Sequence, residues 1–239
     1  MVEKSVRPDL SRPDGVAARA SAGAPRASAG AARAASPNWS AKTISRFKPL
    51  LFLLGLYPVM RWFWLGTHDG LTANPVEFLT RSSGTWAIVC LMVTLAVTPL
   101  RRLLKQPGLV RLRRMCGLFA FFYAALHFTA WVYWDRALDP SLMIQDVYER
   151  PFITVGFAAF VLLCLLAATS TQGWMKRLGK RWQKLHRAVY LIGGLVVLHY
   201  WWHKAGKNDF FEPSIYAGIL AVLLGFRVVV WLRNRAAAR

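Results

Sequence analysis

Long uninterrupted runs of apolar residues constrain this chain more than any other feature of its sequence. Several runs approach the roughly 20 residues that an α-helix needs to cross a hydrocarbon core about 30 Å thick. Six runs qualify, at about Phe47–Leu65, Gly84–Leu104, Met115–Trp134, Pro151–Thr169, Leu185–Trp202 and Pro213–Leu232. They predict an all-α fold: a polytopic membrane helical bundle with six transmembrane helices.

The distribution of charge separates two explanations for a formal net charge of +20. A nucleic-acid-binding protein places its basic residues on a soluble folded surface. Here the Lys and Arg residues gather in every second gap between the apolar runs, and the acidic residues lie in the other gaps. Basic loops of membrane proteins stay in the cytoplasm. We therefore expect membrane lipid and no nucleic acid as the surroundings, a bacterial inner membrane, and both termini in the cytoplasm.

The first part of the chain differs from the rest. Between residues 16 and 36 it consists mostly of Ala, Arg, Ser and Gly, without apolar periodicity. This composition is typical of disorder. We expect two regions: a disordered basic cytoplasmic arm over residues 1–45 and a transmembrane domain over residues 46–235.

Two histidines lie at matching depth in the predicted bundle. His127 lies about 12 residues into the third span and His199 about 14 residues into the fifth, so both lie roughly 18–21 Å from the cytoplasmic ends of their helices. Polar residues in membrane spans usually face the bundle interior. Such a pair could bind the iron of a heme from both sides. The small residues Gly117, Ala120 and Ala124 share the face of His127, and they either make room for a porphyrin or form a helix–helix contact.

The other histidines are weaker candidates. His186 lies 13 residues before His199, which places it about 19 Å lower and about 140° away on an ideal helix. The two would share a face only if the helix were irregular, for which Gly193–Gly194 is the expected place. Three roles remain for His186: it could bind a second heme, contact a quinone or flavin, or cap the helix. His203 is the alternative ligand to His199, and His68 lies in a predicted surface turn.

Several segments resemble one known family. They are Gly84–Arg102, Arg113–His127, Glu149–Gly156 and, most specifically, Trp182–Tyr190 followed by His199. They are similar to the MsrQ (formerly YedZ) family, the heme-binding membrane subunits of the bacterial protein-methionine-sulfoxide reductase system. The resemblance covers about residues 47–235. The wider group is the ferric-reductase-like transmembrane domain.

This resemblance implies a function in electron transfer. The family binds b-type heme and is credited with FMN. It takes electrons from the quinone pool or a cytoplasmic flavin reductase and passes them to a periplasmic molybdopterin subunit, MsrP, which repairs methionine sulfoxide in oxidised envelope proteins. The functional histidines of the family correspond to His127, His186 and His199, whereas its FMN site corresponds to no residue that we can name.

The sequence contains no recognisable nucleotide-binding motif. No GxGxxG follows a strand pattern, and the stretch from Gly173 to Lys180 is one residue too long for a P-loop. We expect no attached flavin or nicotinamide domain, so the catalytic site would lie on a partner. Two alternatives remain open: a ferric-chelate or oxygen reductase core of the same fold, and a transporter or membrane anchor whose histidines serve packing or proton relay.

Overall fold

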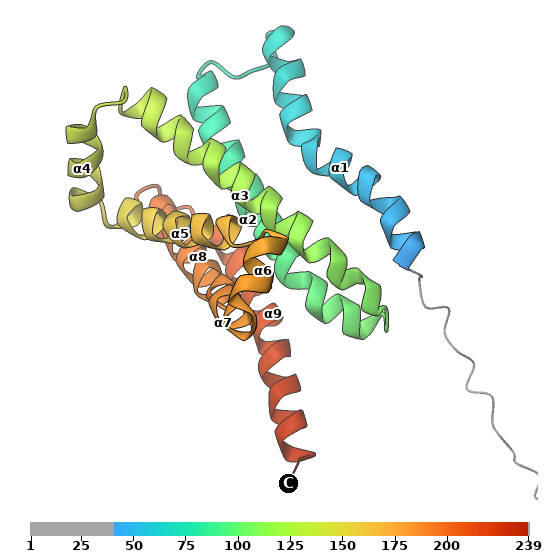
Figure 1. Cartoon of the computed structure of the whole chain (residues 1–239). Helices are drawn as coiled ribbons and strands as arrows, with labels where there is room; N and C mark the ends of the chain where they lie inside the picture. The colour runs from blue at the N-terminus through green and yellow to red at the C-terminus, as the bar shows by residue number, and fades with distance from the viewer. Residues whose placement is uncertain (1–40, 239) are drawn as a thin grey trace, which may run out of the picture. The chain divides into compact units, whose positions relative to one another are not determined.

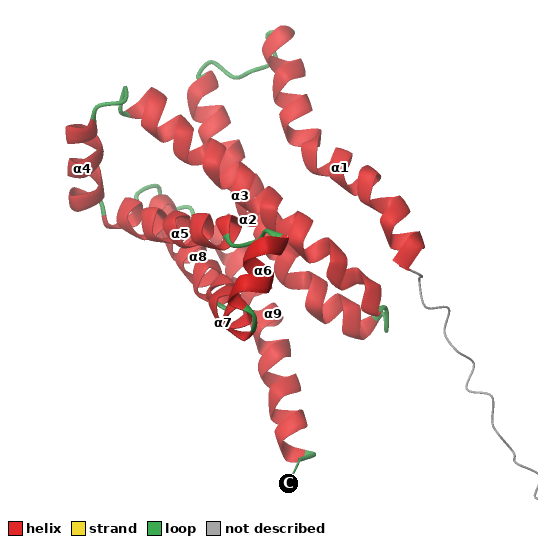
Figure 2. Cartoon of the chain, viewed as in Figure 1, coloured by secondary structure: helices red, strands yellow, loops and turns green. Residues whose placement is uncertain are grey.

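The computed structural model describes residues 41–238, which form helices and no strand (Figure 2). The expected arm falls outside the described residues up to position 40. The all-helical class predicted from the apolar runs is confirmed for the described part of the chain.

The helices follow one another with short connections (Figure 1). In chain order they are α1 (Ala41–Thr67), α2 (Pro75–Leu103), the 3-10 segment η1 (Pro107–Leu112), α3 (Arg113–Ala130), the π-helical segment η2 (Trp131–Asp135), α4 (Pro140–Glu149), α5 (Pro151–Ala168), α6 (Gln172–Leu178), α7 (Lys180–His186), α8 (Ala188–Ala205) and α9 (Phe211–Ala236).

Five stretches within the described residues are long and apolar enough to cross a membrane. They are Arg46–Thr67, Pro75–Leu103, Pro107–Asp135, Pro151–Ala168 and Phe211–Ala236. The remaining expected span corresponds to α8, which has 18 residues. Two histidines, a lysine and several aromatic residues occupy its second half and lower its apolar character. The chain is therefore a multi-pass membrane protein.

The second span starts nine residues earlier than its apolar run. Asn74 is the N-cap of α2, and its side chain accepts a hydrogen bond from the Glu77 backbone N–H at 3.1 Å. Pro75 occupies the first helical position, where its missing N–H costs nothing. Polar residues after this cap belong to the helix although they interrupt its hydropathy, so the helix is longer than the apolar run.

The core joins the second, third and eighth helices. Leu95 of α2, Ala120 of α3 and Ile192 of α8 are fully buried in one cluster. A Cβ atom on Gly117 would lie 3.6 Å from Thr94 Cγ2 of α2. The small residues of α3 therefore form a helix–helix contact at Gly117 and Ala120, the second of the two roles open to them.

A partly buried arginine, Arg227, links the last helix to the second. Arg227 of α9 donates hydrogen bonds to the backbone carbonyls of Leu223 and Leu95, and its guanidinium lies 5.2 Å from the centre of the Tyr190 ring. In a regular helix the Leu95 carbonyl would accept from residue 99, but Pro99 has no N–H to donate. Arg227 thus satisfies a carbonyl that the proline leaves free.

We predict that Arg227→Met lowers the free energy of unfolding by about 1–3 kcal/mol, because it leaves a buried carbonyl unpaired. The loss should be smaller in a Pro99→Ala background, where residue 99 can donate to Leu95. Thermal unfolding in detergent, with the exposed Arg233→Met as control, measures both. An equal loss with and without Pro99 would contradict this account.

Candidate two-histidine centre

The structure brings His127 of α3 and His199 of α8 together. Their ring centroids lie 6.2 Å apart and the ring planes meet at 75°. The two side chains thus come from different helices, as the matching depths predicted, and form a pair inside the helix bundle.

Each imidazole is held by a backbone carbonyl of a neighbouring helix. His127 Nδ1 lies 2.8 Å from the Thr80 oxygen of α2, and His199 Nδ1 lies 2.7 Å from the Phe152 oxygen of α5. A carbonyl oxygen only accepts, so each Nδ1 carries the proton and donates. Nε2 is then the unprotonated nitrogen, which is the form of histidine that binds a metal.

A glycine stands beside each histidine, one helical turn after the carbonyl that the ring contacts. A Cβ atom on Gly84 would lie 3.1 Å from His127 Nδ1, and one on Gly156 would lie 2.6 Å from His199 Nδ1. A helical side chain covers the turn that precedes its own Cα. Glycine at these positions therefore exposes the carbonyls of Thr80 and Phe152 to the imidazoles.

The two halves of the site repeat one arrangement. Each histidine follows its carbonyl partner by 47 residues. Carbonyl, glycine and histidine all recur after the same 72 residues: Thr80, Gly84 and His127 in α2 and α3, then Phe152, Gly156 and His199 in α5 and α8. The centre is therefore built from two similar helix pairs that each contribute one imidazole.

The geometry fits a metal held between the rings. Two metal–nitrogen bonds of about 2 Å each would fit between rings whose centroids lie 6.2 Å apart. The described residues include no group of three or more His, Cys, Asp and Glu side chains arranged for a metal ion. Two imidazoles suit a metal whose other ligands come from a macrocycle, as in heme.

One further polar atom at the site is free. Thr80 Oγ1 is buried and has no hydrogen-bond partner among the described residues. It belongs to the residue whose carbonyl holds His127. A buried hydroxyl of this kind costs stability unless something pairs with it, so it is available to a bound group.

His186 lies apart from the pair. It is the last residue of α7, its Nε2 lies 3.1 Å from Thr169 Oγ1, and the Trp182 ring stacks on it with centroids 4.0 Å apart. Trp182 Nε1 also donates to the Thr169 carbonyl at 2.9 Å. No second histidine contacts His186 within residues 41–238.

The helix irregularity expected at Gly193–Gly194 is located elsewhere. Both glycines lie inside the continuous helix α8, and the break falls at Arg187, between α7 and α8. A Cβ atom on Gly193 would lie 3.1 Å from Leu220 Cδ1, so this glycine serves close packing against α9. Gly193–Gly194 was only the place where a bend could occur, and glycine permits a bend but does not require one.

The remaining two histidines are not members of the pair, although His203 packs on the same Phe152 ring as His199. His203 is one turn beyond His199, and its ring centroid is 5.6 Å from that of Phe152. His68 is exposed after the end of α1, stacks on Trp64 at 3.8 Å and places Nδ1 3.0 Å from the Trp64 oxygen. His68 thus occupies the surface turn predicted for it.

An ion-pair network fixes the helix that follows the π-helical segment. Asp146 of α4 is buried and contacts Arg136, Arg150 and the Trp131 indole N–H, the last at 3.3 Å. Arg150 is the N-cap of α5, two residues before Phe152. The network therefore anchors the start of the helix whose carbonyl holds His199.

Comparison with known proteins agrees with this architecture. The ferric reductase like transmembrane component family matches residues 83–198, so the segment from α2 into α8 is similar to ferric-reductase-like membrane proteins. No solved structure matches the chain.

Curated relatives narrow the class to one family. The chain is 72% identical over 200 residues to the protein-methionine-sulfoxide reductase heme-binding subunit MsrQ of Bordetella pertussis, covering 84% of this chain and 97% of that protein. It is 57% identical to MsrQ of Ralstonia nicotianae, covering 82% and 92%, and 51% identical to MsrQ of Xanthomonas euvesicatoria, covering 69% and 75%. The chain belongs to the MsrQ family.

Proposed function

We propose that this protein is the heme-binding membrane subunit of a protein-methionine-sulfoxide reductase system. In this proposal b-type heme binds between His127 and His199 and carries electrons through a bacterial inner membrane. The observation that carries the proposal is the facing imidazole pair, each ring held through Nδ1 so that Nε2 is free. The names of the relatives support the same cofactor.

The chain contributes binding, orientation and exclusion of water to the chemistry. Bound heme supplies one-electron transfer at its iron. The Thr80 and Phe152 carbonyls fix the rotation and tautomer of the two imidazoles, and these hydrogen bonds raise the electron density of the ligands. Gly84 and Gly156 let the rings approach the helices that hold them.

The proposed topology has six spans with both termini in the cytoplasm. α8 is the fifth of the six spans in chain order, and its partner α5 supplies the carbonyl that pairs with His199. The gaps with residues 101–114 and 176–187 carry many cations and no acid, which supports a cytoplasmic location for them. The histidine pair then lies in the periplasmic half of the membrane.

The proposed electron route needs partners on both sides. Electrons enter from the quinone pool or from a cytoplasmic flavin reductase, and His186 lies on this side as a contact for a quinone or a second heme. They leave to a periplasmic molybdopterin subunit of the MsrP kind, which reduces methionine sulfoxide in envelope proteins. FMN belongs to the proposal only through the family resemblance, and we assign it to no residue.

Replacing either ligand tests the pair. His127→Ala and His199→Ala should each remove most of the heme from the purified protein, because one axial ligand is lost in each. Heme content and the reduced-minus-oxidised absorption spectrum measure the effect, and the exposed His68→Ala is the matched control. Heme at the level of the unmodified protein in both ligand variants would refute the assignment.

The glycines beside the rings give a graded test. Gly156→Ala should disturb the heme more than Gly84→Ala, since the new Cβ would lie 2.6 Å from the His199 ring but 3.1 Å from the His127 ring. Gly218→Ala, where a Cβ meets nothing within 4 Å, is the control. Electron paramagnetic resonance of the ferric iron and the midpoint potential report the ligand geometry directly. Equal spectra for all three variants would contradict the assigned role of these glycines.

Electron delivery tests the function itself. Membrane vesicles that hold this protein and a periplasmic molybdopterin reductase should couple oxidation of a quinol analogue, or of a flavin reductase substrate, to reduction of methionine sulfoxide. The coupling should vanish in His199→Ala. Reduction of a ferric chelate or of oxygen without any transfer to the molybdopterin subunit would favour a ferric-reductase function instead.

A further inference from the structure

A groove runs between the first and third helices at their basic ends. Residues of α1, η1 and α3 line it, and its volume is about 550 Å³. Its walls are the side chains of Lys48, Phe52, Leu56, Arg111, Arg114, Met115, Leu118, Phe119 and Phe122. Three of these are cations, six are apolar and none is acidic, so the groove matches a ligand with an anionic head and an apolar tail.

The cations and the apolar residues are separated along both helices. Lys48, Phe52 and Leu56 are spaced four residues apart on α1, so they share one face. Arg114, Leu118 and Phe122 have the same spacing on α3. In each row the cation lies nearest the helix N-terminus and the apolar residues follow it along the helix. The two rows together form a site with a basic mouth and an apolar floor.

Protein side chains leave this groove partly open. α1 meets α3 mainly through Phe119 and Tyr123: the Tyr123 hydroxyl donates to the Gly55 carbonyl, and Phe52 and Phe119 place their ring centroids 5.4 Å apart. On the same side Phe52 is 48% exposed, Leu118 39% and Phe122 37%. In a membrane such apolar surface contacts acyl chains.

We propose that this groove binds one anionic phospholipid. Lys48, Arg111 and Arg114 bind the phosphate of its headgroup, and an acyl chain lies along Phe52, Leu118 and Phe122. Basic pockets between transmembrane helices on the cytoplasmic side are the sites where anionic headgroups bind. The lipid would fill the space between α1 and the helix that carries His127.

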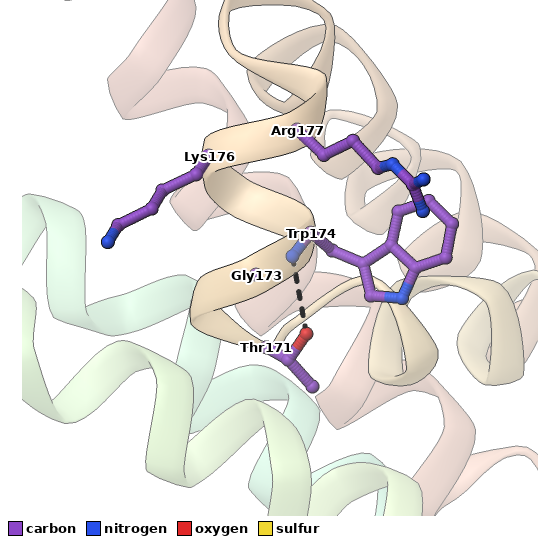
Figure 3. A pocket seen from close by; sticks show the side chains of 5 residues that line it. All are labelled: Thr171, Gly173, Trp174, Lys176 and Arg177. Carbon is purple, nitrogen blue, oxygen red and sulfur yellow. Dashed lines mark hydrogen bonds between the residues drawn. The ribbon is translucent and has the colours of Figure 1, made fainter.

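A second basic hollow provides a matched control. Thr171, Gly173, Trp174, Lys176 and Arg177 line it, and Arg177 lies 5.5 Å from the centre of the Trp174 ring while Lys176 points away from it (Figure 3). This hollow has cations but no row of apolar residues leading from them. Variants of this hollow therefore report how much of any lipid binding comes from general attraction of anions to the basic loops.

Native mass spectrometry of the heme-loaded protein tests the proposal, with phosphatidylglycerol and phosphatidylcholine added in equal amounts. The unmodified protein should retain one phosphatidylglycerol. The combined Lys48→Gln, Arg111→Gln and Arg114→Gln variant should bind it on the order of a hundredfold more weakly. The combined Lys176→Gln, Arg177→Gln and Lys180→Gln variant, which removes as many cations elsewhere, should bind it as before.

A variant that fills the groove without changing its charge separates a specific site from surface attraction. Leu118→Trp with Phe122→Trp should also lose the lipid. Thermal unfolding in detergent, which should stay unchanged in every variant, shows that each protein is folded, and it does not depend on heme. Equal retention of phosphatidylcholine, retention by the groove variants, or a quinone recovered in place of the lipid would overturn the proposal.

Discussion

The hydrogen bond from an imidazole N–H to a helical backbone carbonyl is the interaction on which the centre depends. It occurs twice, from His127 to Thr80 and from His199 to Phe152. A buried imidazole with an unsatisfied N–H would be costly in the apolar interior of a membrane bundle. The hydrogen bond from Nδ1 removes that cost. It also leaves Nε2 unprotonated, with a lone pair that can bind a metal. Stability and ligand preparation thus come from the same contact.

The repeated arrangement explains how two such bonds meet at one point. The helix pairs α2–α3 and α5–α8 each offer a carbonyl, a glycine one turn later and a histidine 47 residues beyond the carbonyl. Ala120 and Ile192, which are separated by the same 72 residues, are both fully buried in the shared core. Two similar units packed through a common core therefore bring two equivalent side chains face to face.

The sequence predicts the helices and the histidine pair but not the contacts that hold them. Apolar runs and helix rise are local properties, and they suffice to place His127 and His199 at one depth. Such an analysis does not reveal the role of Gly84 and Gly156, because that role depends on histidine rings that come from other helices. Their recurrence 72 residues apart is the signal that could have revealed them. Helix α2 was expected too short because the Asn74 cap, and not hydropathy, decides where it starts.

In the proposed topology, α8 is also the span that can least enter a membrane alone. His199, His203 and Lys204 lie in its last turns, and each charged or polar group there opposes insertion. Its neighbours offset this cost: Phe152 accepts from His199, and Lys204 pairs with Asp209 at 2.6 Å in the following loop. In that topology the helix depends on α5 for its place in the bilayer. The same contact with α5 orients His199 toward the His127 ring on α3. The polar groups that lower the apolar character of this helix are therefore also the ones that form the site.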